Sequence, residues 1–265
     1  MATASTAARS LDQPIVSLRG VGKTFANGVV ALDRFDVDVR PGEFLSLLGP
    51  SGCGKSTALR LIAGLSAASR GAIAWPAGVE AKGNRGIGFV FQEPTLMPWA
   101  TVSGNVYLPL KLKGIDKQSS GSRVMDAVDR VGLKDFAGVY PRELSGGMKM
   151  RVSIARALVT QPKLLLMDEP FAALDEITRF KLNDDLLALW QSLGKTVVFV
   201  THSVFESVYL SSRIVVMTPR PGRVLTELAI DAPYPRGQDF RTSAEYAGFC
   251  RLTSDALARA MGGAE

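Results

Sequence analysis

The sequence predicts an α/β fold with a mainly parallel β-sheet core and helices on its faces. Over residues 148–218, short apolar segments typical of strands alternate with segments whose apolar residues have helical spacing. Earlier in the chain, a glycine-rich loop at residues 49–56 stands between a predicted strand and a predicted helix. Parallel strands need a long crossover, usually a helix, so this alternation favours a parallel sheet.

The predicted elements of the second half follow one another with short connections. After a helix from about Met148, they are a strand over 163–167, a helix over 180–193, a strand over 196–200, a helix over 204–210 and a strand over 213–218.

Before residue 92 the sequence predicts four strands and one helix. Residues 15–21, 29–39, 43–48 and 86–91 have strand character, and the helix begins near Lys55. The pairs Asn27-Gly28 and Pro41-Gly42 are typical of turns between strands.

The chain also carries three segments outside this core. Prolines 94 and 98 open a loop that leads into helix-spaced apolar residues, which predicts a helical insertion at about 93–146. Residues 1–13 are rich in Ala, Ser and Thr and are expected to be a disordered N-terminus. Residues 231–265 are predicted to be a partly helical C-terminal extension, following a domain over 14–230.

Composition excludes several classes of protein. Of the 265 residues, 46% are hydrophobic and 21% charged, as in soluble globular proteins, and no run approaches the roughly 20 apolar residues of a membrane span. The net charge of +6 suits anionic partners, but the basic residues are scattered, which argues against nucleic acid. Two cysteines and one histidine exclude a disulfide scaffold and a multi-histidine metal site, and they favour a reducing cytoplasm.

The glycine-rich loop matches the phosphate-loop pattern of Gly, four residues, Gly, Lys and Ser. Glycines let successive backbone N–H groups point at one anion, and the following helix adds its positive dipole end. Lys55 is expected to reach the β- and γ-phosphates, and the Ser56 hydroxyl to bind Mg²⁺. The predicted phosphate-binding residues are Gly49, Pro50, Ser51, Gly52, Cys53, Gly54, Lys55, Ser56 and Thr57.

A second candidate feature is the apolar strand that ends in Asp168 and Glu169. Because the carboxyl ends of parallel strands face the ligand crevice, Asp168 is placed to hold Mg²⁺, directly or through water. Glu169 follows, where it can accept a proton from water attacking the γ-phosphate. An ordinary strand end with acidic residues is the alternative, and the phosphate loop in the same chain favours the functional interpretation.

The third feature is Ser145-Gly146-Gly147, just before the helix that starts at Met148. A serine and exposed N–H groups at a helix N-terminus form an anion site without a lysine. A two-fold dimer would give this site a purpose, with the phosphate loop of one subunit and this motif of the other enclosing one ATP. The alternative is a plain N-cap by Ser145.

Over residues 14–230 the chain resembles the ATP-binding subunits of ABC transporters. Gln92 is similar to the family's Q-loop glutamine, Asp175 to its D-loop and His202 to its switch histidine, and Phe25 stands where the family stacks an aromatic ring on adenine. At Met148 the chain departs from the commonest signature, which has Gln.

The resemblance implies the ABC ATPase fold: a P-loop (RecA-like) parallel-sheet core, an N-terminal antiparallel β subdomain and a helical insertion. It implies ATP and Mg²⁺ as ligands. The implied catalytic residues are Glu169, His202, Gln92 and Lys55, and the implied metal ligands are Ser56, Gln92 and Asp168.

More narrowly, residues 91–99 and 168–175 are similar to bacterial importers of nitrate, sulfonate and taurine. This implies a subunit that hydrolyses ATP to drive import of an organic or inorganic anion through a separate transmembrane permease, served by a solute-binding protein. It also implies a homodimer in the ATP-bound state, bound peripherally to the cytoplasmic face of the inner membrane, with no nucleic-acid partner. The Met97–Trp99 segment is then the region that receives the permease.

Two other functions remain as alternatives. A soluble ABC-type ATPase acting on nucleic acid or ribosomes usually carries long coiled-coil or tandem-domain insertions, for which 265 residues leave no room. A small-molecule kinase built on the same loop would leave Gln92, residues 144–147 and His202 without a shared purpose.

Overall fold

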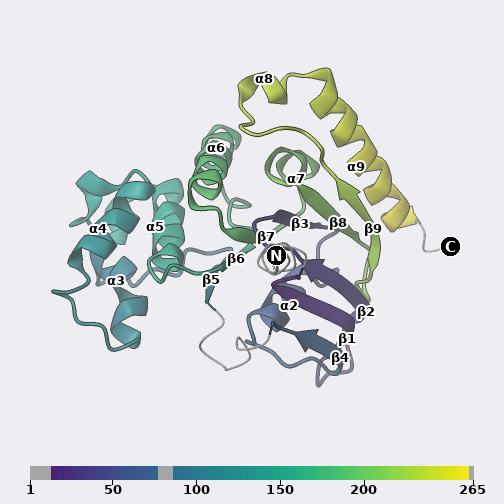
Figure 1. Cartoon of the computed structure of the whole chain (residues 1–265), viewed down its shortest axis with the longest axis horizontal. Helices are drawn as coiled ribbons and strands as arrows, with labels where there is room; N and C mark the ends of the chain where they lie inside the picture. Colours follow the sequence, from purple (N-terminus) through teal and green to yellow (C-terminus); the bar gives the residue numbers. More distant parts are fainter. Residues whose placement is uncertain (1–12, 77–85, 263–265) are drawn as a thin grey trace, which may run out of the picture. The chain divides into compact units, whose positions relative to one another are not determined.

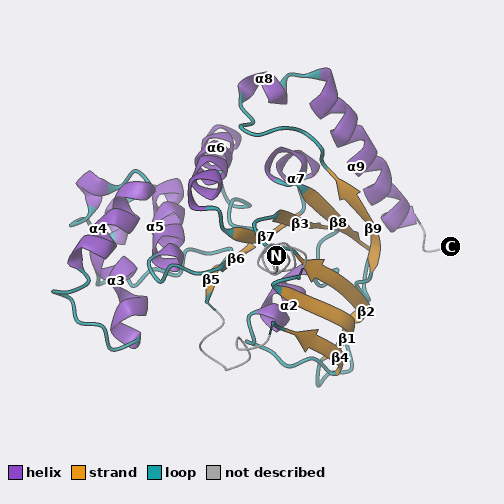
Figure 2. Ribbon diagram, viewed as in Figure 1, coloured by secondary structure: helices purple, strands orange, loops and turns teal. Residues whose placement is uncertain are grey.

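The computed structural model describes residues 13–76 and 86–262, coloured along the chain in Figure 1 and by secondary structure in Figure 2. The chain forms two compact units: Met1–Arg85 together with Gly194–Glu265, and Gly86–Leu193. The predicted disordered N-terminus lies outside the described residues, apart from residue 13.

The first unit contains a three-stranded antiparallel sheet with the strand order β2-β1-β4. It consists of β1 (Val16–Thr24), β2 (Val30–Val39) and β4 (Arg70–Ala74). Burial alternates along β2, so one face of this sheet packs on the core. The expected antiparallel β subdomain is therefore confirmed, and β4 is a strand that the sequence analysis did not predict.

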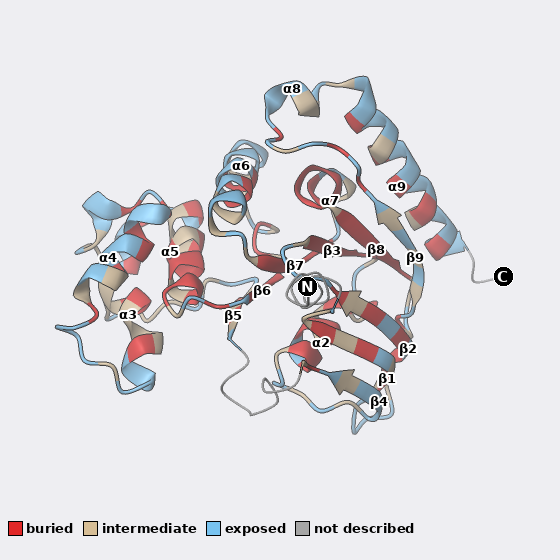
Figure 3. Ribbon diagram, in the orientation of Figure 1, coloured by how far each residue is buried: buried red, intermediate tan, exposed pale blue. Residues whose placement is uncertain are grey.

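The same unit holds the parallel strands that carry the glycine-rich loop. β3 (Phe44–Leu48) lies between β7 (Thr196–Thr201) and β8 (Arg213–Met217), parallel to both, and β9 (Val224–Ala229) pairs antiparallel with β8. Every residue of β3, β7 and β8 is buried, as Figure 3 shows. Strands covered on both faces need continuous apolar runs, which is why these segments lack the alternation seen in β2.

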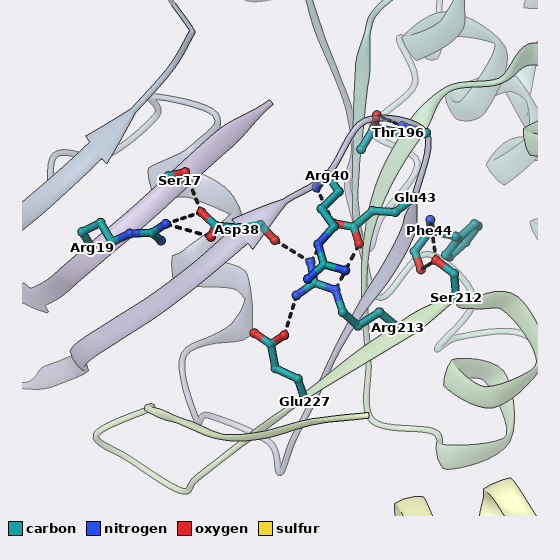
Figure 4. A network of polar contacts seen from close by, with 11 residues as sticks. Ser17, Arg19, Asp38, Arg40, Glu43, Phe44, Thr196, Ser212, Arg213 and Glu227 are labelled. Atoms are coloured by element: carbon teal, nitrogen blue, oxygen red, sulfur yellow. Dashed lines mark hydrogen bonds and ion pairs between the residues drawn. The ribbon is translucent and has the colours of Figure 1, made fainter. Parts of the chain in front are cut away.

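A buried arginine joins the two sheets of the first unit (Figure 4). The Arg213 guanidinium donates to both carboxylate oxygens of Glu43, at 2.7 and 3.1 Å, and to Glu227 at 2.6 Å. It also donates to the backbone carbonyl of Asp38 at the end of β2. Its charge and its donors are therefore satisfied by groups from β2, β9 and the turn before β3.

The second unit pairs two parallel strands with a group of helices. β5 (Ile87–Val90) is parallel to β6 (Leu164–Asp168). The helices are α3 (Val102–Leu112), α4 (Gly121–Arg130), the short 3₁₀ turns η1 (Lys134–Phe136) and η2 (Pro141–Glu143), α5 (Gly146–Leu158) and α6 (Glu176–Leu193). Because α3 contacts both α4 and α5, the helix after the serine-glycine motif packs with the helical insertion.

Two helices of this unit begin earlier than predicted. α5 begins at Gly146 instead of Met148, and α6 begins at Glu176 instead of Phe180. In each case a side chain just before the helix caps it: Ser145 accepts from Met148 N, and Asp175 accepts from Thr178 N. Side-chain capping allows a helix to begin before its first apolar residue.

The remaining elements of the first unit are helical. α2 (Lys55–Ile62) follows the glycine-rich loop and α7 (Val204–Leu210) follows β7. In the C-terminal extension, α8 (Gln238–Arg241) precedes α9 (Ala244–Gly262), which packs against α7, β8 and β9.

In the sequence, the spacing of Tyr246, Phe249, Leu252 and Leu257 suggests that this segment packs on the body. The buried stripe of α9 differs from that set. Tyr246 is buried as expected, but Leu252 is 47% exposed. The other buried positions are Cys250, Thr253, Ala256 and Ala260. Small residues let the helix lie close to the body, whereas periodicity alone gives weight to the larger leucine.

Arg236 attaches the extension to α7. It is 4% exposed, and its Nη1 donates to the carbonyls of Val208, Tyr209 and Ser211 at 2.9, 3.1 and 2.9 Å. Its guanidinium also lies 4.1 Å from the ring centroid of Tyr234. The last carbonyls of a helix lack partners within the helix, and the positive charge of Arg236 favours this end of α7.

We predict that Arg236→Ala lowers the free energy of unfolding by about 2–4 kcal/mol, because several buried carbonyls lose a charged donor. Chemical denaturation followed by circular dichroism measures this. Arg259→Ala, on the exposed face of α9, is the matched control and should change stability by less than about 0.5 kcal/mol. Equal effects of the two substitutions would contradict a special role for Arg236.

Candidate functional site

The glycine-rich loop connects the carboxyl end of β3 to the first turn of α2. Gly52 and Gly54 have φ angles of 76° and 109°, in the left-handed region that favours glycine. A Cβ at Gly54 would lie 2.7 Å from the Ala31 carbonyl oxygen, and one at Gly49 would lie 2.9 Å from Cys53 Sγ. Backbone conformation and close packing therefore both require the glycines of the motif.

Lys55 is held at this loop. Its side chain is buried, and Nζ donates to the carbonyls of Gly49 and Pro50 at 2.8 and 3.0 Å. Gly54 precedes α2 and has no side chain. It therefore caps none of the first backbone N–H groups of the helix. A buried ammonium beside a helix N-terminus in a glycine-rich loop is suited to bind phosphate.

His202 leaves the same edge of the sheet as this loop. In the parallel pair of β3 and β7, Leu48 is opposite Thr201, and His202 is exposed just beyond the strand. The turn around it is fixed by buried Glu206, whose Oε2 accepts from Thr201 Oγ1 at 2.6 Å. Ser203 N in turn donates to Thr201 Oγ1 at 2.9 Å.

Within the second unit, Gln92 and Asp168 also share one strand edge. Val90 of β5 is opposite Met167 of β6, so both parallel strands end at this edge. Asp168 is buried, with 6% of its surface exposed, whereas Gln92 is exposed. The structure thus brings these two predicted metal ligands to the same end of a parallel strand pair.

Glu169 has an unusual backbone conformation. Its φ is +44°, in the left-handed region that is sparsely populated by residues other than glycine. Such conformations cost about 1–3 kcal/mol and concentrate at functional sites. The chain bends at Glu169, between the end of β6 and Pro170.

The three side chains predicted to hold Mg²⁺ offer suitable donors. Ser56 supplies a hydroxyl oxygen in the first unit, and Gln92 and Asp168 supply amide and carboxylate oxygens in the second. Mg²⁺ prefers oxygen ligands that include one or two carboxylates together with substrate phosphate. The donor chemistry therefore fits the metal, and the assignment of these residues stays a prediction.

The Ser145-Gly146-Gly147 motif caps α5 and leaves its first residues exposed. Ser145 Oγ accepts from Met148 N at 3.3 Å, and Ser145 and Gly146 are both exposed. A Cβ at Gly147 would lie 2.9 Å from Thr178 Cγ2 of α6, which explains the second glycine. Met148 enters the cap through its backbone, so the replacement of Gln at this position leaves the cap intact.

Asp175 and Phe25 are exposed site candidates. Asp175 caps α6, and hydrogen bonds from the backbone and side chain of Thr178 lower the pKa of its carboxyl group. Phe25 stands in the β1–β2 turn with 43% of its surface exposed, and the Lys23 ammonium lies 5.5 Å from its ring centroid. An exposed ring beside a cation can stack on a nucleotide base.

Two residues that the sequence analysis missed hold the loop between β5 and α3. Asn105 is fully buried; it accepts from Met97 N at 2.7 Å and donates to the carbonyls of Met97, Ala100 and Thr101 at 3.0–3.1 Å. Arg156 of α5 donates to the Pro94 and Thr95 carbonyls. An asparagine in a predicted helix was the available signal, but its partners lie in a loop that only the structure defines.

Comparisons with known proteins identify the family. A family model described as ABC transporter matches residues 32–172. The chain belongs to this family. It is 51% identical over 223 residues to an uncharacterized ABC transporter ATP-binding protein of Methanocaldococcus jannaschii, which covers 83% of this chain and 81% of the relative.

Relatives with named cargo are also similar to this ABC protein. The taurine import ATP-binding protein TauB of Rhizobium johnstonii is 44% identical, covering 78% of this chain and 79% of the relative. An aliphatic sulfonates import ATP-binding protein SsuB of Bacillus cereus is 43% identical, covering 84% of this chain and 89% of the relative. The predicted relationship to the ATP-binding subunits of sulfonate and taurine importers is confirmed.

Solved structures confirm the predicted ABC ATPase fold. A dimeric ATP-binding cassette in a post-hydrolysis state with ADP and Pi has a TM-score of 0.70 and 34% identity, covering 82% of this chain and 100% of that chain. The structure of cbiO1 from Clostridium perfringens, part of an ABC transporter complex, has a TM-score of 0.74 and 27% identity, covering 83% and 90%. The protein is an ATP-binding ABC ATPase, as predicted. Among its described residues, no helix is both long and apolar enough to cross a membrane.

We predict that Asn105→Ala destabilises the second unit by about 2–3 kcal/mol, because buried backbone groups of the loop lose their partner. Denaturant unfolding measures the loss, and the emission of exposed Trp99 should report a less ordered loop before global unfolding. Ser103→Ala, in the first turn of the same helix, is the control and should change little. An Asn105→Ala protein with unchanged stability and unchanged Trp99 emission would show that the loop keeps its conformation without Asn105.

Proposed function

We propose that this ABC ATPase drives import of a solute through a separate transmembrane permease, and that the solute is an organic or inorganic anion such as nitrate, a sulfonate or taurine. The observation that carries the proposal is a phosphate loop and an Asp168-Glu169 strand end in a chain 43–44% identical to taurine and sulfonate import subunits. Matching lengths of chain support the same role, since most of each relative is covered.

In the proposed reaction the loop of residues 49–57 binds the ATP phosphates through backbone N–H groups and Lys55. Mg²⁺, held by Ser56, Gln92 and Asp168, would neutralise part of the phosphate charge. Glu169 accepts a proton from the attacking water, and the ring of His202 donates a hydrogen bond to the γ-phosphate. Phe25 stacks on the adenine base.

Two copies of the chain are proposed to share each ATP. The exposed N-terminus of α5 at Ser145 and Gly146 would bind the γ-phosphate held by the loop of the other copy, with Gly147 and Asp175 beside it. The similar cassette solved as a dimer with ADP and Pi supports this arrangement. The motif can both cap α5 and bind an anion. The Ser145 hydroxyl accepts a hydrogen bond from only one backbone N–H, that of Met148, and the other N–H groups at the start of the helix stay available to a phosphate.

The permease is proposed to bind at the loop held by Asn105 and Arg156. Trp99 in this loop is 77% exposed, although tryptophan is usually largely buried. A rigid loop that presents an aromatic side chain suits a protein partner, because little ordering entropy is lost on binding. We further propose a peripheral position on the cytoplasmic face of the inner membrane, a solute-binding protein as indirect partner, and no nucleic-acid partner.

We predict that Glu169→Gln keeps ATP affinity but lowers the rate of hydrolysis about 10²- to 10⁴-fold, because the amide cannot accept the proton. Phosphate release gives the rate, and equilibrium binding of ATP gives the affinity. Asp255→Asn, at an exposed position of α9, removes the same charge and is expected to hydrolyse normally. Normal hydrolysis by Glu169→Gln would remove this residue from the mechanism.

The slow variant also tests the shared site. With ATP and Mg²⁺ it should sediment as a dimer, and adding Ser145→Arg should return it to a monomer. A monomer at saturating ATP would contradict the two-copy arrangement.

We predict that Trp99→Ala weakens association with the permease at least about 10-fold, as expected for an aromatic anchor worth about 2 kcal/mol or more. The test is co-purification with a co-expressed multi-span permease, together with basal hydrolysis by the free subunit, which should be unchanged. Leu65→Ala, an exposed apolar residue of the first unit, is the control. Capture of nucleic acid with salt-dependent affinity, and no membrane partner, would instead favour the alternative ATPase class.

A further inference from the structure

We propose that the turn between β8 and β9, residues 218–223, braces the phosphate loop from outside, and that Arg220 is a positioning residue for nucleotide binding. This inference rests on the proposed role of residues 49–57 as the site of the ATP phosphates. It concerns the first unit alone, where both segments lie.

The Arg220 guanidinium is hydrogen-bonded to the loop. Nε and Nη2 donate to the carbonyl oxygen of Gly52 at 3.1 and 3.0 Å, although Arg220 is an exposed residue 168 positions away in the chain. Gly52 is one of the two loop glycines with a positive φ. Two donors of Arg220 bind one carbonyl, which fixes the arginine side chain at a cost in side-chain entropy. The same contact restricts the Gly52 peptide group.

Holding the Gly52 carbonyl also sets the direction of a phosphate-binding donor. In a trans peptide the C=O and the following N–H point in opposite directions, so the Gly52 carbonyl and the Cys53 N–H turn together. Cys53 N donates to Pro50 O at 3.3 Å, longer than the usual 2.7–3.2 Å range for such bonds. This weak internal bond is one that a phosphate oxygen can replace.

The next carbonyl of the loop faces the same turn. A Cβ at Gly222 would lie 2.1 Å from Cys53 O and 3.1 Å from Leu32 Cδ2, so only glycine allows the turn to approach the loop this closely. Two consecutive peptide groups of the loop, those that follow Gly52 and Cys53, are therefore backed by residues 220 and 222.

The turn is itself anchored to β2. Gly222 N donates to Ala31 O at 2.9 Å, and Asp33 N donates to Gly222 O at 3.1 Å. Arg223 Nε donates to the buried carboxylate of Asp33 at 3.0 Å. These bonds fix the backbone of the turn, so Arg220 can hold the Gly52 carbonyl in one position.

Charge offers a different explanation, because any cation near the loop attracts a polyphosphate. Substitutions at Arg220 separate the two effects. Lys keeps the positive charge but loses the planar pair of donors, and Ala loses both. Arg19→Ala is the matched control: Arg19 is an exposed arginine of the same unit, and its guanidinium pairs with Asp38 on β2.

The experiment measures KM for ATP, kcat and the rate of Cys53 alkylation by N-ethylmaleimide without nucleotide, on a Cys250→Ser background. Cys53 is 1% exposed, so its alkylation reports opening of the loop. We expect Arg220→Ala to raise KM about 10-fold with kcat within about threefold, and to speed alkylation about 10-fold, the effect of losing hydrogen bonds from a charged donor. Arg220→Lys should resemble Ala, and Arg19→Ala should resemble the unsubstituted protein.

Other results would overturn the inference. Full recovery of KM and alkylation rate by Arg220→Lys, or an equal rise in KM for Arg19→Ala, would reduce the role of Arg220 to its charge. Unchanged KM and alkylation in a folded Arg220→Ala protein would remove the brace and leave the proposed function intact. If the unsubstituted protein does not bind ATP, and Lys55→Ala does not change this result, the proposed function itself is wrong.

Discussion

The proposed chemistry of this protein depends on a backbone constraint: several N–H groups of one short loop must point at the same anion. Only residues that tolerate left-handed φ angles permit this curvature, and Gly52 and Gly54 supply them. The freedom that allows the curve also makes the loop costly to order, since glycine loses the most conformational entropy. Neighbouring elements must therefore hold the loop in place. Ala31 and Leu32 of β2 lie against Gly54, and Met217 at the end of β8 lies against Gly49.

A second constraint is the shared edge of parallel strands. In the first unit it brings the phosphate loop and His202 to the ends of β3 and β7, and in the second it brings Gln92 and Asp168 to the ends of β5 and β6. Each unit therefore presents a part of the proposed chemistry at the carboxyl ends of parallel strands, the edge at which open α/β sheets bind their ligands. The strain at Glu169, which begins where β6 ends, is sustained by this packing.

In several parts of the molecule, arginine side chains donate hydrogen bonds to backbone carbonyl groups. Arg213 links β2 to the turn before β3, Arg236 completes the end of α7, Arg156 orders the loop before α3, and Arg220 holds Gly52. A planar guanidinium carries five donors, so one side chain can satisfy several carbonyls that no strand or helix pairs. The loop before α3 and the glycine-rich loop are thereby held by arginine side chains, where regular secondary structure supplies no partner.

The sequence by itself determined the α/β class, the family and the order of the motifs, because those depend on local spacing: glycines in a turn, an apolar run before Asp168, and serine before two glycines. It placed the starts of α5 and α6 too late, since capping by Ser145 and Asp175 is a side-chain contact that periodicity does not contain. It missed β4, the roles of Asn105 and Arg236, and the small-residue stripe of α9. Only the tertiary structure decided these, because each depends on partners brought together from distant parts of the chain. The contact of Arg220 with Gly52, across 168 positions, has the same physical origin.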